Sequence, residues 1–151
     1  MSDMEDAFEI GKEIVEERHG EFKNKPEEFH FKSGLLEQSM AAHTQSTIPM
    51  NTISGDGENN AGTVVFYSKE AEPHTITVDE HLANHHPEKA TKSLLHELYE
   101  WRAAEVMPSD QVLQGNTDFI AEFNENSLCR EVNERLGNEV CDESWNNEYE
   151  T

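Results

Sequence analysis

The sequence predicts an α+β fold in which a small sheet of few strands packs against about three to four helices. Two observations predict it: segments with apolar residues at helical spacing lie toward both ends of the chain, and two short β-branched segments lie between them. The order helix, loops, two strands, helix, helix favours α+β over a helical bundle. The length of 151 residues fits one domain, residues 1–151.

The first part of that domain, residues 1–62, is expected to be helical and loop-like. Residues 4–18 have near-helical apolar spacing and acidic residues in the first turn, where the helix dipole favours them, so they predict a helix. Residues 19–33 are polar and contain a proline, which predicts a loop. Residues 34–45 predict a second short helix, and residues 52–62, rich in Gly, Asn and Asp, predict a turn or loop.

The core is expected in residues 63–136, as strand, strand, helix, helix. The β-branched and aromatic content of TVVFYS at 63–68 and TITV at 75–78 predicts two strands. Residues 87–106 begin with a proline and carry an apolar stripe, so they predict a helix that ends before Pro108. Apolar periodicity predicts a last helix at 117–136.

The remaining residues, 137–151, are acidic and irregular and predict a frayed tail, in which Trp145 is the residue able to dock on the core. The two cysteines, Cys129 and Cys141, form no CxxC pair, so we expect reduced thiols, with Cys129 buried in the core, in preference to a disulfide. A structural four-thiolate zinc site is not indicated.

The charge and the distribution of apolar residues each exclude a class of function. The chain has 32 Asp and Glu against 11 Lys and Arg, a formal net charge of −21, which excludes binding to nucleic-acid phosphates through a basic patch. No apolar run approaches the length of a membrane span, and the N-terminus MSDMEDAFEI is acidic where a signal peptide is basic and then apolar. A cytoplasmic protein is therefore expected.

The acidity itself has three explanations that the sequence leaves open. Hydrated carboxylates can adapt a protein to high salt, as in a halophilic source, and only seven Lys stand against 25 Glu. The carboxylates can also mimic nucleic-acid charge, or simply keep the chain in solution.

The segment LLHELYEW at 94–101 is the best candidate for chemistry. On a helix, His96 and Glu100 lie one turn apart on the same face, so both side chains can reach one metal ion. Glu97, beside His96, would then be the general base that takes a proton from bound water. The metallopeptidase motif HExxH uses this arrangement, and here the fifth letter is Glu. One imidazole with carboxylates suits zinc, and is a harder donor set that leans toward manganese or iron.

A catalytic metal site of this type needs a third protein ligand, commonly an acidic residue on the next helix. Glu122 and Glu125 lie one helical turn apart in the last predicted helix, and either one can supply that ligand. A further pair, His81 and His85, has helical spacing and is a weaker metal-binding candidate.

These segments together resemble the ImmA/IrrE-type metallopeptidases, a zincin-like family linked to phage repressor cleavage and stress responses. TITVDEHL at 75–82 resembles the family's strand, SLLHELYEW at 93–101 its active-site helix and AEFNENSLCREV at 121–132 its ligand helix. The resemblance implies that His96 and Glu122 are metal ligands and that Glu97 is the catalytic base. The family's second metal-binding histidine falls on Glu100.

The sequence therefore predicts a metal-dependent peptidase that hydrolyses a protein substrate with one Zn²⁺, Mn²⁺ or Fe²⁺ ion. Two alternatives remain open. The HELYE helix is also compatible with an ordinary solvated surface, because Glu is a good helix former. The whole chain is also compatible with a non-enzymatic acidic interaction or structural protein, for example a viral or accessory factor whose zincin-like scaffold lacks the metal.

Overall fold

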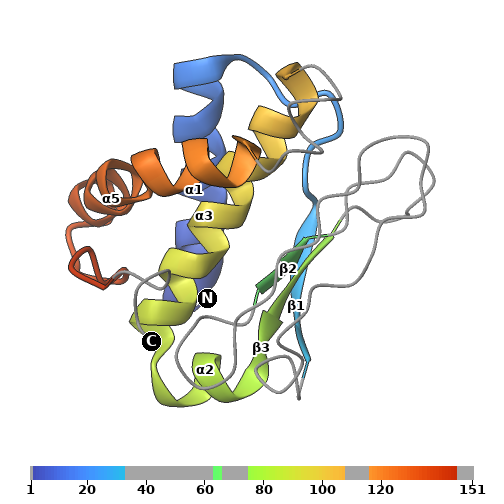
Figure 1. Ribbon diagram of the computed structural model, residues 1–151. Helices are drawn as coiled ribbons and strands as arrows, with labels where there is room; N and C mark the ends of the chain where they lie inside the picture. The colour runs from blue at the N-terminus through green and yellow to red at the C-terminus, as the bar shows by residue number, and fades with distance from the viewer. Residues whose placement is uncertain (1, 33–62, 66–74, 108–115, 146–151) are drawn as a thin grey trace.

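The computed structural model describes residues 2–32, 63–65, 75–107 and 116–145, and it contains both helices and strands (Figure 1). In chain order the elements are α1 (Asp3–His19), β1 (Glu28–Lys32), β2 (Thr63–Val65), β3 (Thr75–Asp79), α2 (Glu80–His85), α3 (Pro87–Val106) and α5 (Asn116–Leu136). The mixed helical and strand content that the sequence predicts is confirmed. The helices expected at 87–106 and 117–136 are α3 and α5.

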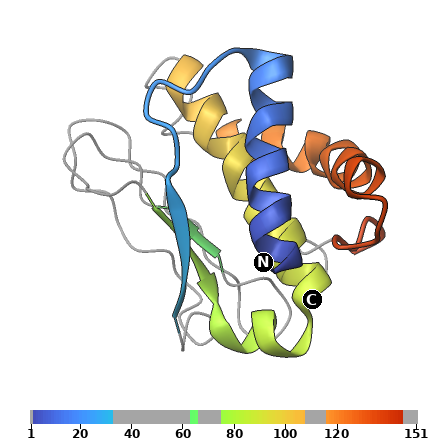
Figure 2. The same ribbon diagram turned by 180° about the vertical axis from the view of Figure 1, so that it is seen from behind.

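The described strands form a three-stranded sheet with the order β1-β3-β2. β3 is the central strand, parallel to β1 and antiparallel to β2. Helix α3 contacts α1, α5 and the sheet, so it lies at the centre of the molecule, with β2 and β3 on one side and α5 on another (Figures 1 and 2). This central place explains why every residue of α3 from Ala90 to Glu105 is buried.

Helix α1 is fixed at its beginning and along its buried face. Ser2 caps it: the Ser2 hydroxyl accepts a hydrogen bond from Glu5 N, and the Glu5 carboxylate accepts one from Ser2 N. In the middle of the helix Gly11 lies against α3, where an added Cβ would stand 2.5 Å from Leu95 Cδ2 and 3.2 Å from Leu98 Cδ1. The first part of the chain is therefore integral to the core.

The close approach at Gly11 can be tested with Gly11→Val. The branched side chain has no room beside Leu95 and Leu98, so we expect the free energy of unfolding to fall by about 2 to 3 kcal/mol. Urea denaturation followed by circular dichroism measures it. Glu13→Val, an exposed position of the same helix, is the matched control and should change stability by less than about 1 kcal/mol. Equal effects of the two variants would contradict the close packing.

The prediction of a loop over residues 19–33 is wrong in part, because β1 lies within it. The strand forms because it pairs with β3, and because Phe29 packs edge-on against Phe8 of α1 with ring centroids 5.1 Å apart. Of the strand expected at 63–68, the structure describes residues 63–65 as β2. The helix expected at 34–45 and the loop expected at 52–62 lie outside the described residues.

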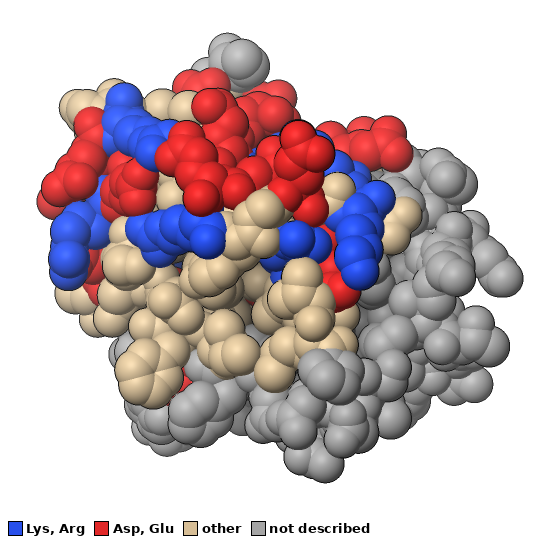
Figure 3. Space-filling view, turned by 90° about the horizontal axis from the view of Figure 1, so that it is seen from above, with Lys and Arg blue, Asp and Glu red and all other residues tan. Residues whose placement is uncertain are grey.

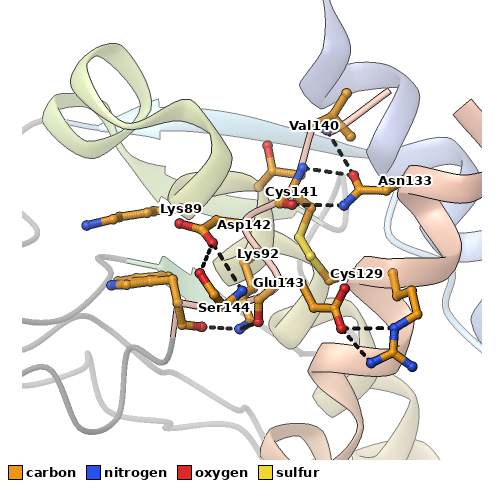
Figure 4. Close-up of a disulfide and its surroundings, with 12 residues drawn as sticks. Lys89, Lys92, Cys129, Asn133, Val140, Cys141, Asp142, Glu143 and Ser144 are labelled. Carbon is orange, nitrogen blue, oxygen red and sulfur yellow. Dashed lines mark hydrogen bonds and ion pairs between the residues drawn. A yellow bond between two sulfur atoms is a disulfide. The ribbon is translucent and has the colours of Figure 1, made fainter. Parts of the chain in front are cut away.

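The prediction of two reduced cysteines is also wrong: Cys129 and Cys141 form a disulfide, with their Cα atoms 5.7 Å apart. Helix α5 ends at Leu136, and Gly137 follows in the left-handed region with φ +67°, which turns the chain back along the helix and brings Cys141 to Cys129. Figure 4 shows this pair and its surroundings.

We call residues 137–145 the C-terminal segment. A frayed tail was expected here, but the segment is held against the helices: the Asn133 amide donates to Cys141 O, and Asn133 Oδ1 accepts from the backbone N–H groups of Val140 and Cys141 (Figure 4). Trp145 is buried, which agrees with the expectation that this residue can dock on the core. The part of the tail beyond residue 145 lies outside the described residues.

The surface carries many carboxylates, and the basic side chains are interleaved with them on the face shown in Figure 3. Each of the four arginines of the sequence forms an ion pair. Arg18 and Arg135 both pair with Glu131, and Arg135 also reaches Glu17, which joins α1 to α5. None of the described helices has the length and apolarity that crossing a membrane requires.

Candidate metal centre

The polar residues of the HELYE segment lie in the interior of the molecule. His96, Glu97 and Glu100 are 3%, 1% and 2% exposed, because α3 is covered by other elements along most of its length. The interpretation of this segment as an ordinary solvated surface is therefore wrong.

These three side chains converge on one place. Each offers one ligand atom, and these atoms lie within 4.8 Å of one another. His96 Nε2 is 3.9 Å from Glu97 Oε2. Two donors bound to one tetrahedral zinc ion at about 2.1 Å are about 3.4 Å apart, so a small closure would let these two donors share an ion. Glu97 Oε1 and Glu100 Oε1 are both buried, and both residues take part in further interactions.

Helix α5 contributes one further carboxylate to this group. Glu125 is buried, and its Oε1 atom lies 3.1 Å from His96 Nδ1, within hydrogen-bond distance. Glu122, one turn earlier, is half-buried and takes part in an interaction of its own, and the metal-binding group of His96, Glu97 and Glu100 includes neither Glu122 nor Glu125. Of the two carboxylates that the sequence left open, Glu125 lies on the Nδ1 side of His96, and both stay candidates for the site.

Lys92 lies one helical turn before His96 on α3 and is also buried. Its ammonium group donates hydrogen bonds to the backbone oxygens of Glu143, at 2.8 Å, and of Trp145 (Figure 4). Burial lowers the pKa of Lys92, while the nearby carboxylates of Glu125, Asp142 and Glu143 act to raise it. A basic group therefore stands at the end of the cluster that faces the C-terminal segment.

The disulfide lies on the same part of α5 as the cluster. Glu125, Cys129 and Asn133 follow one another at one-turn intervals: the first contacts His96, and the other two hold Cys141. The C-terminal segment is thereby fixed to α5, and its carbonyl groups bind Lys92 of α3. The C-terminal segment therefore links α5 to α3 beside Lys92.

The weaker histidine candidates lie elsewhere. His81 and His85 lie on α2 with their ring centroids 4.3 Å apart and their planes tilted by 41°, and both are exposed. His30 on β1 is also exposed and lies 3.3 Å from Glu28. The cluster around His96 is the group with three or more metal-ligating side chains found in the described part of the chain. His43 and His74 fall outside that part.

The sequence pattern does not predict Lys92 as part of the site, and it favours reduced thiols over the disulfide. The available signal for Lys92 was its position four residues before His96, on the face that carries the candidate ligands. For the disulfide it was Gly137, placed to end a helix between the two cysteines.

No family model, curated protein or solved structure matches the chain. The function of the chain is therefore inferred from its own residues.

Proposed function

We propose that the chain is a zincin-like, metal-dependent hydrolase that cleaves a peptide bond in a protein substrate. The observation that carries the proposal is the meeting of one imidazole and three carboxylates, those of His96, Glu97, Glu100 and Glu125, in the interior between α3 and α5. The order of strand β3, the HELYE helix and a second helix with an acidic residue is that of the ImmA/IrrE-type enzymes that the sequence resembles.

The chemistry of the donors fits a divalent cation. Carboxylates in the interior repel one another and lose hydration, and such groups are normally paired with cations or coordinated to metals. Glu97, Glu100 and Glu125 together carry up to three negative charges, and Lys92 supplies one positive charge near Glu125. A divalent ion would offset the negative charge that Lys92 leaves uncompensated.

The residues have separate roles in this proposal. His96 would bind the ion through Nε2, because Nδ1 faces Glu125, and a carboxylate on the other ring nitrogen is the usual way in which a metal-binding histidine is oriented. Glu100 would be the carboxylate ligand from the same helix face, and Glu122 of α5 would be the third protein ligand that such a site needs. Glu97 would accept the proton of the attacking water and later deliver it to the leaving amine. The ion, when bound, lowers the pKa of its water and polarises the scissile carbonyl.

The donor set also bears on which metal is bound. One nitrogen and carboxylate oxygens make a harder site than the two imidazoles and one carboxylate of common zinc peptidases, so Mn²⁺ and Fe²⁺ are candidates beside Zn²⁺. Since the cluster residues are at most 3% exposed, a protein substrate reaches Glu97 only after part of the chain opens.

The test is the metal content of the purified protein, measured by elemental mass spectrometry beside that of His96→Ala. We expect close to one equivalent of zinc, manganese or iron in the wild type and almost none in the variant. His85→Ala, which removes an exposed imidazole, is the matched control and should keep the metal. Absence of metal from the wild type, even after reconstitution with each ion, would refute the proposal and favour the non-enzymatic acidic protein.

The same measurement tests the two carboxylates of α5. Glu125→Gln should weaken metal binding by about 10- to 100-fold, the usual cost of losing a carboxylate that orients a metal-binding histidine, and Glu122→Gln, which removes the proposed third ligand, should weaken it at least as much. Unchanged metal binding by the Glu122→Gln variant would remove Glu122 from the site.

A further inference from the structure

A groove of about 520 Å³ lies between the first half of α1 and strand β1, apart from the metal centre. Figure 2 shows β1 running beside α1. The apolar lining comes from three phenylalanines in a chain of edge-on contacts, Phe8 to Phe29 at 5.1 Å and Phe29 to Phe31 at 5.7 Å between ring centroids. Phe31 is 48% exposed, so part of its ring is open to solvent in the groove.

The groove continues past Phe31. A second hollow of about 340 Å³ shares Ser2 and Phe31 with the first and is also lined by Ala83 of α2 and Pro87 of α3. Phe31 therefore stands between two hollows that together follow the beginning of α1. This shape suits an extended chain better than a compact ligand.

The rim of the groove is acidic. Glu5, Glu9, Glu27 and Glu28 all line it. Lys12 pairs with Glu9 at 3.0 Å and covers the Phe8 ring, so one positive charge stands against four negative ones. His30 lies beside Glu28 but adds a charge only when it is protonated. An apolar floor with an acidic rim is complementary to a ligand that is both apolar and basic.

The sheet adds a reason to expect an extended ligand. In the described sheet β1 is an outer strand, paired with β3 on one side. A peptide can add to the edge of a sheet through main-chain hydrogen bonds, with alternate side chains entering pockets.

We propose that this groove is a docking site for an extended peptide segment of another protein that carries basic residues beside an aromatic or aliphatic anchor. The anchor packs on Phe29 and Phe31, and the basic side chains lie against the glutamates of the rim. A second copy of this chain is a poor occupant, because two molecules of net charge −21 repel each other. The proposal does not depend on the metal centre.

The probe is a fluorescein-labelled seven-residue peptide in which Lys alternates with Leu and a central Phe, and fluorescence anisotropy measures its binding to the full chain. Phe31→Ser should weaken binding at least tenfold, because exposed aromatic anchors dominate such interfaces. Phe123→Ser is the matched control: Phe123 is 80% exposed on α5, outside the groove, and its loss should leave binding unchanged.

A second variant tests the charge of the rim and does not require that Phe31→Ser folds. Glu27→Gln/Glu28→Gln should weaken binding about fivefold and reduce its dependence on salt. Glu21→Gln/Glu134→Gln removes the same charge from exposed positions that do not line the groove and should have little effect.

Four results would overturn the proposal. The first is equal binding by the Phe31→Ser and Phe123→Ser variants, and the second is equal loss of binding from the two glutamate pairs, since either means unspecific attraction to an acidic protein. The third is equal binding of a peptide with Glu in place of Lys. The fourth is self-association of the wild type in sedimentation that Phe31→Ser abolishes, which would make a second copy the occupant.

Discussion

Replacing Glu97 by Gln is expected to lower the rate of peptide hydrolysis by about 10²- to 10⁴-fold, the usual contribution of a general base. The amide has almost the same shape as the carboxylate but cannot accept the proton of the attacking water. The metal should stay, because His96 and Glu100 are unchanged. Cleavage of fluorescein-labelled, denatured casein by the metal-loaded protein measures the rate, and elemental analysis of the same sample measures the metal.

The control for this prediction is Glu88→Gln, an exposed glutamate near the beginning of the same helix, which should retain full activity. A Glu97→Gln variant that cleaves casein as fast as the wild type would remove Glu97 from the mechanism. If instead the variant loses both metal and activity, Glu97 is a ligand, an assignment that its place in the cluster also permits.

The second large effect is expected for Trp101→Ala, which should lower the free energy of unfolding by about 3 to 5 kcal/mol. Trp101 is fully buried in α3, and its indole N–H donates to Asn24 O at 2.9 Å. The variant loses the packing of the ring and the bond that ties the chain before β1 to α3. Total stabilities of domains are about 5 to 15 kcal/mol, so much of the fold's margin would be lost.

Urea denaturation followed by circular dichroism measures this loss. Trp101→Phe separates the two contributions, since it keeps most of the ring volume and removes the hydrogen bond, and should cost about 1 to 2 kcal/mol. A loss below 1 kcal/mol for Trp101→Ala would show that α3 is not the centre of the core.

The long helices could be predicted from the sequence because their signals are local. Pro87 and Pro108 bracket α3, and its apolar stripe repeats at the helical period over several turns. Strand β1 has no comparable signal: it is five residues long, follows a polar stretch with Pro26, and forms through pairing with a strand far along the chain. The disulfide likewise depends on the reversal of the chain at Gly137.

The same distinction applies to the candidate site. His96, Glu97 and Glu100 belong to one helix, so their spacing alone brought them together. The choice between Glu122 and Glu125 depends on how α5 is rotated against α3, which tertiary packing sets. The burial of Lys92 depends on the C-terminal segment, whose carbonyl groups bind its ammonium group.

The excess of carboxylates that remains after all four arginines are paired has a kinetic consequence for encounters with other molecules. With a net charge of −21, the long-range field of the molecule is that of a polyanion. Such a field steers cations toward the surface before any contact forms, and it slows the approach of anions. Association of metal ions and basic peptides should therefore be fastest in dilute buffer and slow down as salt shortens the reach of the field.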